Sequence, residues 1–343
     1  MAGSIRRIHS AEPRLIAMPA PQFMHWPVRT AQAAIILICG VFFLTGLSAE
    51  VKTIALTFDD APRGEGPFFS GTERTQELIA ALESAGAQGA MFYATTGLIE
   101  KYDPEHARLK AYVDAGHVLA NHSHSHPWLH RSDADQYLQD IDKASNILTD
   151  LEGYHAFYRF PYLDEGRSQA KRDAVRQGLV DRGLKHGYVT VDNYDWYMQA
   201  LVSEAVKAGF KPDQQRLGET YVDLLLQSIE FYDEIAEEHL GRSPAHVLLL
   251  HENDLAALYI DDLVQALRER GWTIVPALEA YRDPLSALLP ETLFNGQGRV
   301  AALAHAQGVP AQQLVHHSED EQWLRQEFLR RGLLPRANEA EHQ

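Results

Sequence analysis

Four histidines lie within nine residues of the sequence, and their spacing could hold a metal ion. They are His122, His124, His126 and His130. Residues four apart on a helical turn share a face, with Cβ atoms about 5–6 Å apart, so His122 and His126 could bind one ion. The sets 122/124/126 on an extended chain and 126/130 on a helix are alternatives. A solvated loop is the common explanation of one such pair, but four histidines directly after an apolar run favour a metal site.

Two adjacent carboxylates, Asp59 and Asp60, follow another apolar run. If both were buried together without a cation they would repel each other, and one would take up a proton. A metal ion removes this difficulty, because one carboxylate can bind it while the other stays free as a base. The alternative is a capping or turn pair, which is common for Asp-Asp after a strand. Two histidines and one aspartate would make a three-ligand site with an open position, which is typical of catalytic zinc.

Polar side chains with catalytic potential also follow three further apolar runs. These residues are Arg159, Tyr162, Asp192, Asp195, Trp196 and His251. In parallel α/β folds the carboxyl ends of the strands converge, and active sites form there. Five segments that are far apart in the sequence are therefore expected to meet at one place, and this coincidence is stronger support than any single motif.

Seven short apolar runs alternate with helical stretches along the chain. The expected strands are residues 54–58, 89–93, 117–121, 156–160, 187–191, 246–250 and 272–276. The expected helices lie near residues 73–85, 104–115, 133–151, 168–183, 214–239 and 261–270. Most of the strand runs are continuously apolar, as in parallel strands that are buried on both faces. The alternation predicts an α/β protein with a parallel sheet, and seven units predict a barrel that is one unit short of the usual eight.

Two segments do not fit this alternation. Residues 197–212 show no strong periodicity and are interpreted as an insertion. After Pro284 the helical patterns weaken, but Ser318 and Glu321 form a capping-box pattern that predicts a helix to about Leu329.

The composition excludes several classes of protein. With 343 residues, 45% hydrophobic and 23% charged, the chain can bury a large core without disulfides. Its single cysteine, Cys39, excludes an internal disulfide and any site built from several cysteines. The net charge of −16 argues against a nucleic-acid partner, because such proteins neutralise phosphates with Lys and Arg.

The N-terminal residues predict export. Residues 33–47 form an uncharged run of 15 that follows four arginines and precedes Ser48 and Ala49. This is the layout of a secretory signal, and the run is short for a spanning helix of about 20 residues. We therefore expect a periplasmic or extracellular protein. The alternative is an uncleaved membrane anchor, in which case alone we expect contact with the membrane.

Five motifs, in this order, resemble the polysaccharide deacetylase family, which is also called carbohydrate esterase family 4 or the NodB homology domain. They are T-F-D-D at 57–60, H-S-x-x-H at 122–126, R-x-P-Y at 159–162, D-x-x-D-W at 192–196 and L-L-H at 249–251. The resemblance spans about residues 52–280. It implies a distorted (β/α)7 barrel and the metal-dependent removal of N-acetyl groups from polymeric amino sugars.

The resemblance also implies a role for each motif residue. Asp60, His122 and His126 would hold one divalent ion, which we expect to be zinc. Asp59 would be the general base. His251 would be the general acid that protonates the departing amine.

Four further residues would support these groups. Arg159 would hold Asp59 in place, and Asp195 would tune His251. The backbone N–H of Tyr162 would help to bind the oxyanion, and Trp196 would line the acetyl pocket. This set is chemically sufficient, because an amide needs an activated water, a stabilised oxyanion and a proton for its nitrogen.

Two positions depart from the family pattern. Ala61 stands where glycine is usual after the aspartate pair, and Leu163 replaces the usual glycine after Pro-Tyr. We expect three parts: a signal or anchor in residues 1–49, a catalytic domain in residues 50–284, and a helical C-terminal extension in residues 285–343. The expected substrate is an N-acetylated glycan of the peptidoglycan or chitin type. An amidase of the same fold acting on non-sugar amides or imides, and a barrel that only binds glycans, are the alternatives.

Overall fold

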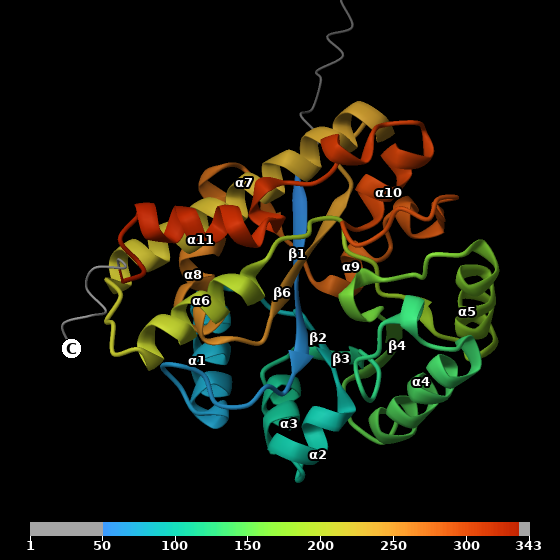
Figure 1. Cartoon of the computed structure of the whole chain (residues 1–343). Helices are drawn as coiled ribbons and strands as arrows, with labels where there is room; N and C mark the ends of the chain where they lie inside the picture. The colour runs from blue at the N-terminus through green and yellow to red at the C-terminus, as the bar shows by residue number, and fades with distance from the viewer. Residues whose placement is uncertain (1–50, 336–343) are drawn as a thin grey trace, which may run out of the picture. The chain divides into compact units, whose positions relative to one another are not determined.

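The computed structural model describes residues 51–335, and its strands form one parallel sheet (Figure 1). The strands are β1 (Thr53–Ala61), β2 (Met91–Ala94), β3 (Val118–Asn121), β4 (Tyr154–Tyr158), β5 (Lys185–His186), β6 (Ala245–His251) and β7 (Thr273–Ile274). Their order is β5-β4-β3-β2-β1-β6, and β7 pairs with the start of β1. The parallel α/β class predicted from the sequence is confirmed.

The two edges of this sheet approach each other, so the sheet curls into a distorted barrel. Val191, which follows β5, forms an isolated parallel bridge with Leu248 of β6. The N–H of Thr190 donates to the carbonyl oxygen of Val247 (3.0 Å), and the N–H of Leu249 donates to that of Val191 (3.1 Å). The barrel is therefore joined on this side by a short contact instead of a full strand pair.

The fifth strand lies earlier than we expected. Residues 185–186 pair with β4, whereas the expected run 187–191 contributes the bridge just described. The N–H of Gly187 still donates to the carbonyl oxygen of Tyr158 (2.6 Å), and the chain then leaves β4 for β6. A Cβ at Gly187 would collide with the ring of Tyr93, so this crossing requires glycine.

Eleven α-helices are present in residues 51–335. They are α1 (Gly71–Ser84), α2 (Thr96–Tyr102), α3 (Ala107–Asp114), α4 (Ala134–Leu148), α5 (Gln169–Asp181), α6 (Asp195–Lys207), α7 (Gln214–Leu240), α8 (Asp254–Glu269), α9 (Ala277–Ala280), α10 (Arg299–Ala306) and α11 (Glu321–Arg330). They surround the sheet in neighbouring pairs, with α1 and α7 packed against α8 on one side and α4 against α5 on another (Figure 1).

Side-chain caps fix where several helices begin. Ser70 and Glu73 form a capping box at the start of α1. Asp133, Asp213 and Asn253 each accept a backbone N–H at the start of α4, α7 and α8. Because α8 begins directly after β6, its cap also fixes the loop that follows His251.

Most of residues 197–212, which we interpreted as an insertion without strong periodicity, belong to α6. One face of this helix is buried through Met198, Leu201, Val202 and Ala205. These positions have the i, i+3, i+4, i+7 spacing of an amphipathic helix, so the signal was present in the sequence.

The predicted capping box near the C-terminus is also wrong, although the helix exists. Asp320 caps α11 by accepting the N–H of Trp323 (2.8 Å). Ser318 is instead fully buried, and its hydroxyl lies 2.7 Å from that of Ser228 in α7. The hydroxyl is therefore used to attach the extension to α7.

The residues after 284 share the main hydrophobic core with the barrel. Their buried side chains include Val300, Leu314, Leu324 and Phe328, with α10 packed on α7 and α11 on α6. The division at residues 284 and 285 stays a prediction. The predicted signal or anchor in residues 1–49 lies outside the described residues. Within residues 51–335, no helix is long and apolar enough to cross a membrane.

Candidate active site

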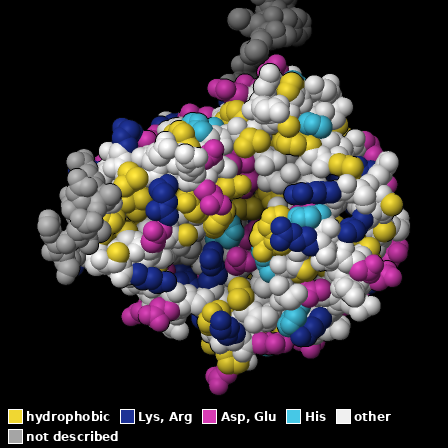
Figure 2. Space-filling view, in the orientation of Figure 1, with side chains coloured by type: hydrophobic (Ala, Val, Ile, Leu, Met, Phe, Trp, Pro, Cys, Tyr) yellow, Lys and Arg dark blue, Asp and Glu magenta, His cyan; other side chains and the backbone are white. Residues whose placement is uncertain are grey.

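A cavity of about 620 Å³ lies at the carboxyl ends of the strands. Figure 2 shows a hollow near the centre of this face, where acidic, basic and histidine side chains gather. Among the nine residues that we predicted for the site, those lining the cavity are Asp59, Asp60, His122, His126, Tyr162, Trp196 and His251. The other two, Arg159 and Asp195, are fully buried behind it.

The three predicted metal ligands meet in this cavity. One ligand atom each from Asp60, His122 and His126 lies within 4.8 Å of the other two. The Oδ1 atom of Asp60 is 3.4 Å from Nε2 of His126 and 3.8 Å from Nε2 of His122. The two Nε2 atoms are 3.2 Å apart. A single ion placed among them would contact all three side chains.

The protonation of these groups suits a cation. The Nδ1 atom of His122 lies 3.0 Å from the carbonyl oxygen of Arg159, which can only accept, so Nδ1 carries the proton. The lone pair of Nε2 then points toward Asp60 and His126. Burial lowers the pKa of His126 to about 4 although Asp60 opposes this, so this ring is neutral at neutral pH. One carboxylate and two imidazoles are a donor set that fits zinc and similar divalent ions.

The other two histidines of the cluster are engaged elsewhere. The Nδ1 atom of His124 lies 2.8 Å from the hydroxyl of Thr96, and its Nε2 atom lies 2.5 Å from Nζ of Lys143. The Nδ1 atom of His130 lies 2.8 Å from Asp164. Of the alternatives that the spacing left open, His122 and His126 are therefore the pair that lies beside Asp60.

The ligand loops hold an unusual backbone conformation. Asp60, Ser123 and His126 have φ values of 63°, 75° and 56°. This left-handed region costs a non-glycine residue about 1–2 kcal/mol, and such strain is often found at functional sites. The side chain of Asn121 accepts the N–H of Ser123 (2.7 Å), and the hydroxyl of Ser123 accepts the N–H of His126 (3.0 Å). These two bonds hold the loop that presents both histidines.

Asp59 is held by a buried arginine, as we predicted. The Nη1 atom of Arg159 donates to Oδ1 of Asp59 (2.6 Å) and to the hydroxyl of Thr57 (2.8 Å). Its Nη2 atom donates to the hydroxyl of Tyr281 (3.0 Å), and its guanidinium lies 3.9 Å from the ring centre of Tyr93. These contacts fix Arg159, and through it the orientation of Asp59. The other oxygen of Asp59, Oδ2, is 3.6 Å from Nε2 of His122 and so borders the ligand set.

His251 is paired with Asp195, the first residue of α6. Its Nδ1 atom lies 2.6 Å from Oδ1 of Asp195, and its backbone N–H donates to Oδ2 (2.9 Å). The side chain of Asn253 also donates to Oδ2 (2.8 Å). Burial alone would lower the pKa of His251, but the charge and hydrogen bond of Asp195 outweigh it and raise that pKa. The imidazole can therefore carry a proton into the cavity.

Aromatic rings form part of the cavity wall. The ring of Tyr162 is 48% exposed and lies 4.5 Å from that of His126 and 4.2 Å from that of Trp128. Tyr162 and Leu163 both have positive φ values, 57° and 50°. Leu163 thus adopts a left-handed backbone conformation. The glycine that is usual at this position in the family pattern would adopt it without strain.

Sequence reasoning missed one wall of the cavity. Asn295, Gln297 and Glu321, which come from the segment after residue 284, line it together with Asp192. Asp192 follows a predicted strand, but we had given it no role. Asn295 and Gln297 belong to no motif, and Glu321 belongs only to the capping-box pattern, so no signal in the sequence placed these three residues at the cavity.

A second acidic pair is buried at this wall. Asp192 faces Glu319 of the extension, and the hydroxyl of Tyr232 donates to Oε1 of Glu319 (2.5 Å). Burial raises the pKa of Asp192 well above its usual range, and Glu319 adds to this. Burial likewise raises the pKa of Glu319 to about 7. Both carboxyl groups therefore keep their protons to a higher pH than usual.

Comparison with known proteins finds similar sequences and structures. Residues 47–182 match the sequence model of the family described as polysaccharide deacetylase. A peptidoglycan-N-acetylglucosamine deacetylase from Bacillus cereus is 30% identical over 144 residues, which are 42% of this chain and 46% of that protein. The peptidoglycan-N-acetylmuramic acid deacetylase PdaC from Bacillus subtilis is 32% identical over 128 residues, 36% of this chain and 25% of that protein.

These matches span less than half the length of either relative. Among solved structures, a family 4 carbohydrate esterase from Streptomyces lividans in complex with acetate matches with a TM-score of 0.44 and 23% identity, over 65% of this chain and 91% of that one. The resemblance seen in the sequence motifs is confirmed by the family match and by the two curated relatives. The chain is similar to the polysaccharide deacetylase family over residues 47–182.

Proposed function

We propose that this protein is a metal-dependent hydrolase that removes N-acetyl groups from amino-sugar glycans of the peptidoglycan or chitin type. One observation carries the proposal. A single cavity is lined by the Asp60, His122 and His126 group together with a base candidate, Asp59, and an acid candidate, His251. The names of the two curated relatives support peptidoglycan as the first glycan to test.

In this proposal each group has a separate task. A divalent ion, zinc in our proposal, would activate a water molecule and polarise the amide carbonyl. Asp59, oriented by Arg159, takes the proton of the attacking water. The backbone N–H of Tyr162 stabilises the oxyanion, and Trp196 borders the acetyl group.

The amide nitrogen must also receive a proton, because an amine anion is a very poor leaving group. His251 donates this proton from Nε2. Asp195 holds the opposite nitrogen, Nδ1, and so keeps both the ring orientation and the charge of the imidazolium. Base and acid are thus two different side chains, each with its own buried partner.

Acetate release from a panel of N-acetylated glycans, with and without a chelator, tests the proposal. We expect release from at least one glycan, its loss on chelation, and its return when zinc is restored. Full activity in protein shown to be metal-free by elemental analysis would contradict the metal requirement. Binding of glycans without acetate release would favour the non-catalytic alternative, and activity confined to non-sugar amides or imides would favour an amidase.

We also propose that the protein acts outside the cytoplasm. The proposal rests on the export pattern in residues 1–49 and on the cell-wall substrates named for both relatives. Cell fractionation of the full chain, with N-terminal sequencing of the mature protein, tests it. Mature protein that still begins before residue 33 and stays in the membrane fraction would support an anchor instead.

A further inference from the structure

A second cavity adjoins the candidate active site. It measures about 350 Å³, and its lining includes Gly64, Tyr102 and Gln199. The two cavities share two lining residues, Asp60 and Arg63. A cationic side chain therefore stands at their junction, beside a candidate metal ligand.

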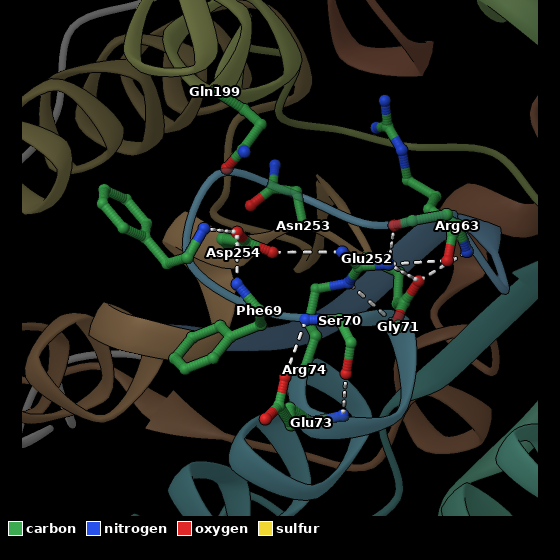
Figure 3. A network of polar contacts seen from close by, with 12 residues as sticks. Arg63, Phe69, Ser70, Gly71, Glu73, Arg74, Gln199, Glu252, Asn253 and Asp254 are labelled. Carbon is green, nitrogen blue, oxygen red and sulfur yellow. Dashed lines mark hydrogen bonds and ion pairs between the residues drawn. The ribbon is translucent and has the colours of Figure 1, made fainter. Parts of the chain in front are cut away.

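The backbone of Arg63 is anchored by buried charged groups (Figure 3). Its N–H donates to Oε2 of Glu252 (2.7 Å). Its carbonyl oxygen accepts from Nη2 of Arg74 (2.7 Å) and from Nη1 of Arg108 (2.8 Å). Glu252, Arg74 and Arg108 are buried and bonded to one another, so the position of Arg63 is fixed.

The side chain of Arg63 takes no part in this network. Figure 3 shows it extending away from Arg74 and Glu252. Its Nη1 atom is buried but has no hydrogen-bond partner among the described residues. The ion pair with Asp60 is long, with 4.0 Å between Nη1 and Oδ2. A guanidinium offers five donors in a planar fork that matches a carboxylate, so Arg63 can accept an anionic group of a ligand.

The negative charge of the rest of the chain makes Arg63 important for binding an anionic ligand. The whole chain carries a net charge of −16, which opposes the approach of an anionic glycan. Glu65 also lines the second cavity, whereas the acids Glu252 and Asp254 are already paired with Arg74. A carboxylate of the substrate would therefore bind beside Arg63, at the junction of the two cavities.

Arg63 lies close to the candidate ligand Asp60, with 4.0 Å between Nη1 and Oδ2. This short distance favours a sugar whose carboxylate is near its acetamido group. In N-acetylmuramic acid the carbon that bears the lactyl ether is the neighbour of the carbon that bears the acetamido group. A sugar with its acetamido group at the Asp60 site thus carries its carboxylate only a few bonds away. N-acetylglucosamine has a neutral hydroxyl at that place.

We propose that Arg63 binds the carboxylate of an N-acetylated sugar of the muramic acid type and makes the site prefer it to neutral amino sugars. This proposal rests on the proposed deacetylase function. It assigns Arg63 to substrate binding and not to the chemical step.

The test compares two matched substrates on the zinc-loaded enzyme. One is a muramic-acid-containing oligosaccharide with a free lactyl carboxylate, and the other is the same oligosaccharide with that carboxylate converted to a neutral amide. We expect the wild-type kcat/KM to favour the free carboxylate by about tenfold or more. Arg63→Gln should bring the ratio of the two kcat/KM values close to one, and Arg63→Lys should keep part of it.

Lys211→Gln is the matched control, because it removes one exposed positive charge from the loop between α6 and α7, outside both cavities. It should leave the ratio unchanged. Equal wild-type rates on the two substrates would overturn the proposal. So would an Arg63→Gln variant that loses both activities equally, because Arg63 would then act through Asp60 or the metal, which metal analysis of the variant would show. If neither substrate nor any glycan of the panel releases acetate, the proposed deacetylase function itself has failed.

Discussion

Two acidic pairs border the same cavity, and they are built in opposite ways. Asp59 and Asp60 face positive or metal-binding groups, whereas Asp192 and Glu319 face each other. Burial alone would raise the pKa of Asp60, but the neighbouring His126, Arg63 and His122 hold that pKa well below its usual range. The first pair is therefore arranged to hold a cation, and the second to hold a proton.

The difference teaches that position after a strand does not decide what an aspartate does. Asp60 and Asp192 both follow a strand-like run and both line the cavity. What separates them is the set of partners supplied by other segments: two histidines after β3 for the first, and a glutamate of the C-terminal extension for the second. Substitutions can break or sharpen this comparison.

Loss of a metal ligand should have the largest effect. Asp60→Ala, His122→Ala and His126→Ala should each abolish tight zinc binding and lower acetate release by more than about 100-fold, since even indirect partners of a metal are worth about 10–100-fold. His124→Ala is the matched control, because its ring bonds Thr96 and Lys143. Metal content and rate are measured for each variant. Loss of metal in His124→Ala but not in His122→Ala would show that the ligand assignment is wrong.

Asp59→Asn separates the two members of the first pair. Asp59 bonds Arg159 and only borders the ligand set, so this variant should keep its metal and lose about 10²–10⁴-fold in turnover. Elemental analysis and the rate of acetate release are again the measurements. If the metal is lost along with the activity, the two aspartates have the opposite roles.

His251→Ala should have an effect that depends on the leaving group. The variant should keep its metal and lose about 10²–10⁴-fold on an N-acetyl sugar, whose nitrogen needs a proton. An activated aryl acetate ester has a leaving group that needs none, so its hydrolysis should fall much less. Equal losses on the amide and the ester would contradict the acid role and leave His251 as a binding residue.

The sequence predicted the first acidic pair far better than the second. Asp59 and Asp60 are adjacent and belong to a motif, and parallel strands bring their carboxyl ends together, so the convergence with His122 and His251 could be predicted. The path of the chain after β5 could not, because it depends on Gly187 passing the ring of Tyr93.

The second acidic pair was beyond sequence reasoning for a similar reason. Asp192 and Glu319 are brought together by the packing of α11 on α6 and by the hydroxyls of Ser228 and Ser318. Such tertiary contacts leave no periodic signal. The helical pattern of α6 did leave one, at the buried residues Met198, Leu201 and Val202.

The smallest expected effect concerns the proton of Glu319 in the second pair. In the unfolded chain Glu319 loses its proton near pH 4.5, whereas in the folded protein it keeps it to about pH 7. A group whose pKa is raised by folding contributes stability that is fully present below the unfolded pKa and is lost as the pH rises through the folded pKa. The free energy of unfolding should therefore fall between about pH 4.5 and 7, by at most about 1.4 kcal/mol per pH unit from this one proton.

Glu319→Gln should remove the part of this slope that Glu319 contributes, because an amide cannot ionise and its oxygen can still accept from Tyr232. The variant should thus match the wild type near pH 4.5 and become the more stable protein as the pH approaches 7. Glu321→Gln is the control, since Glu321 is an exposed carboxylate at the same wall. Denaturant unfolding at several pH values gives the three curves. Identical pH dependence in the wild type and Glu319→Gln would mean that folding does not raise the pKa of Glu319, and the contrast between the two acidic pairs would then fail.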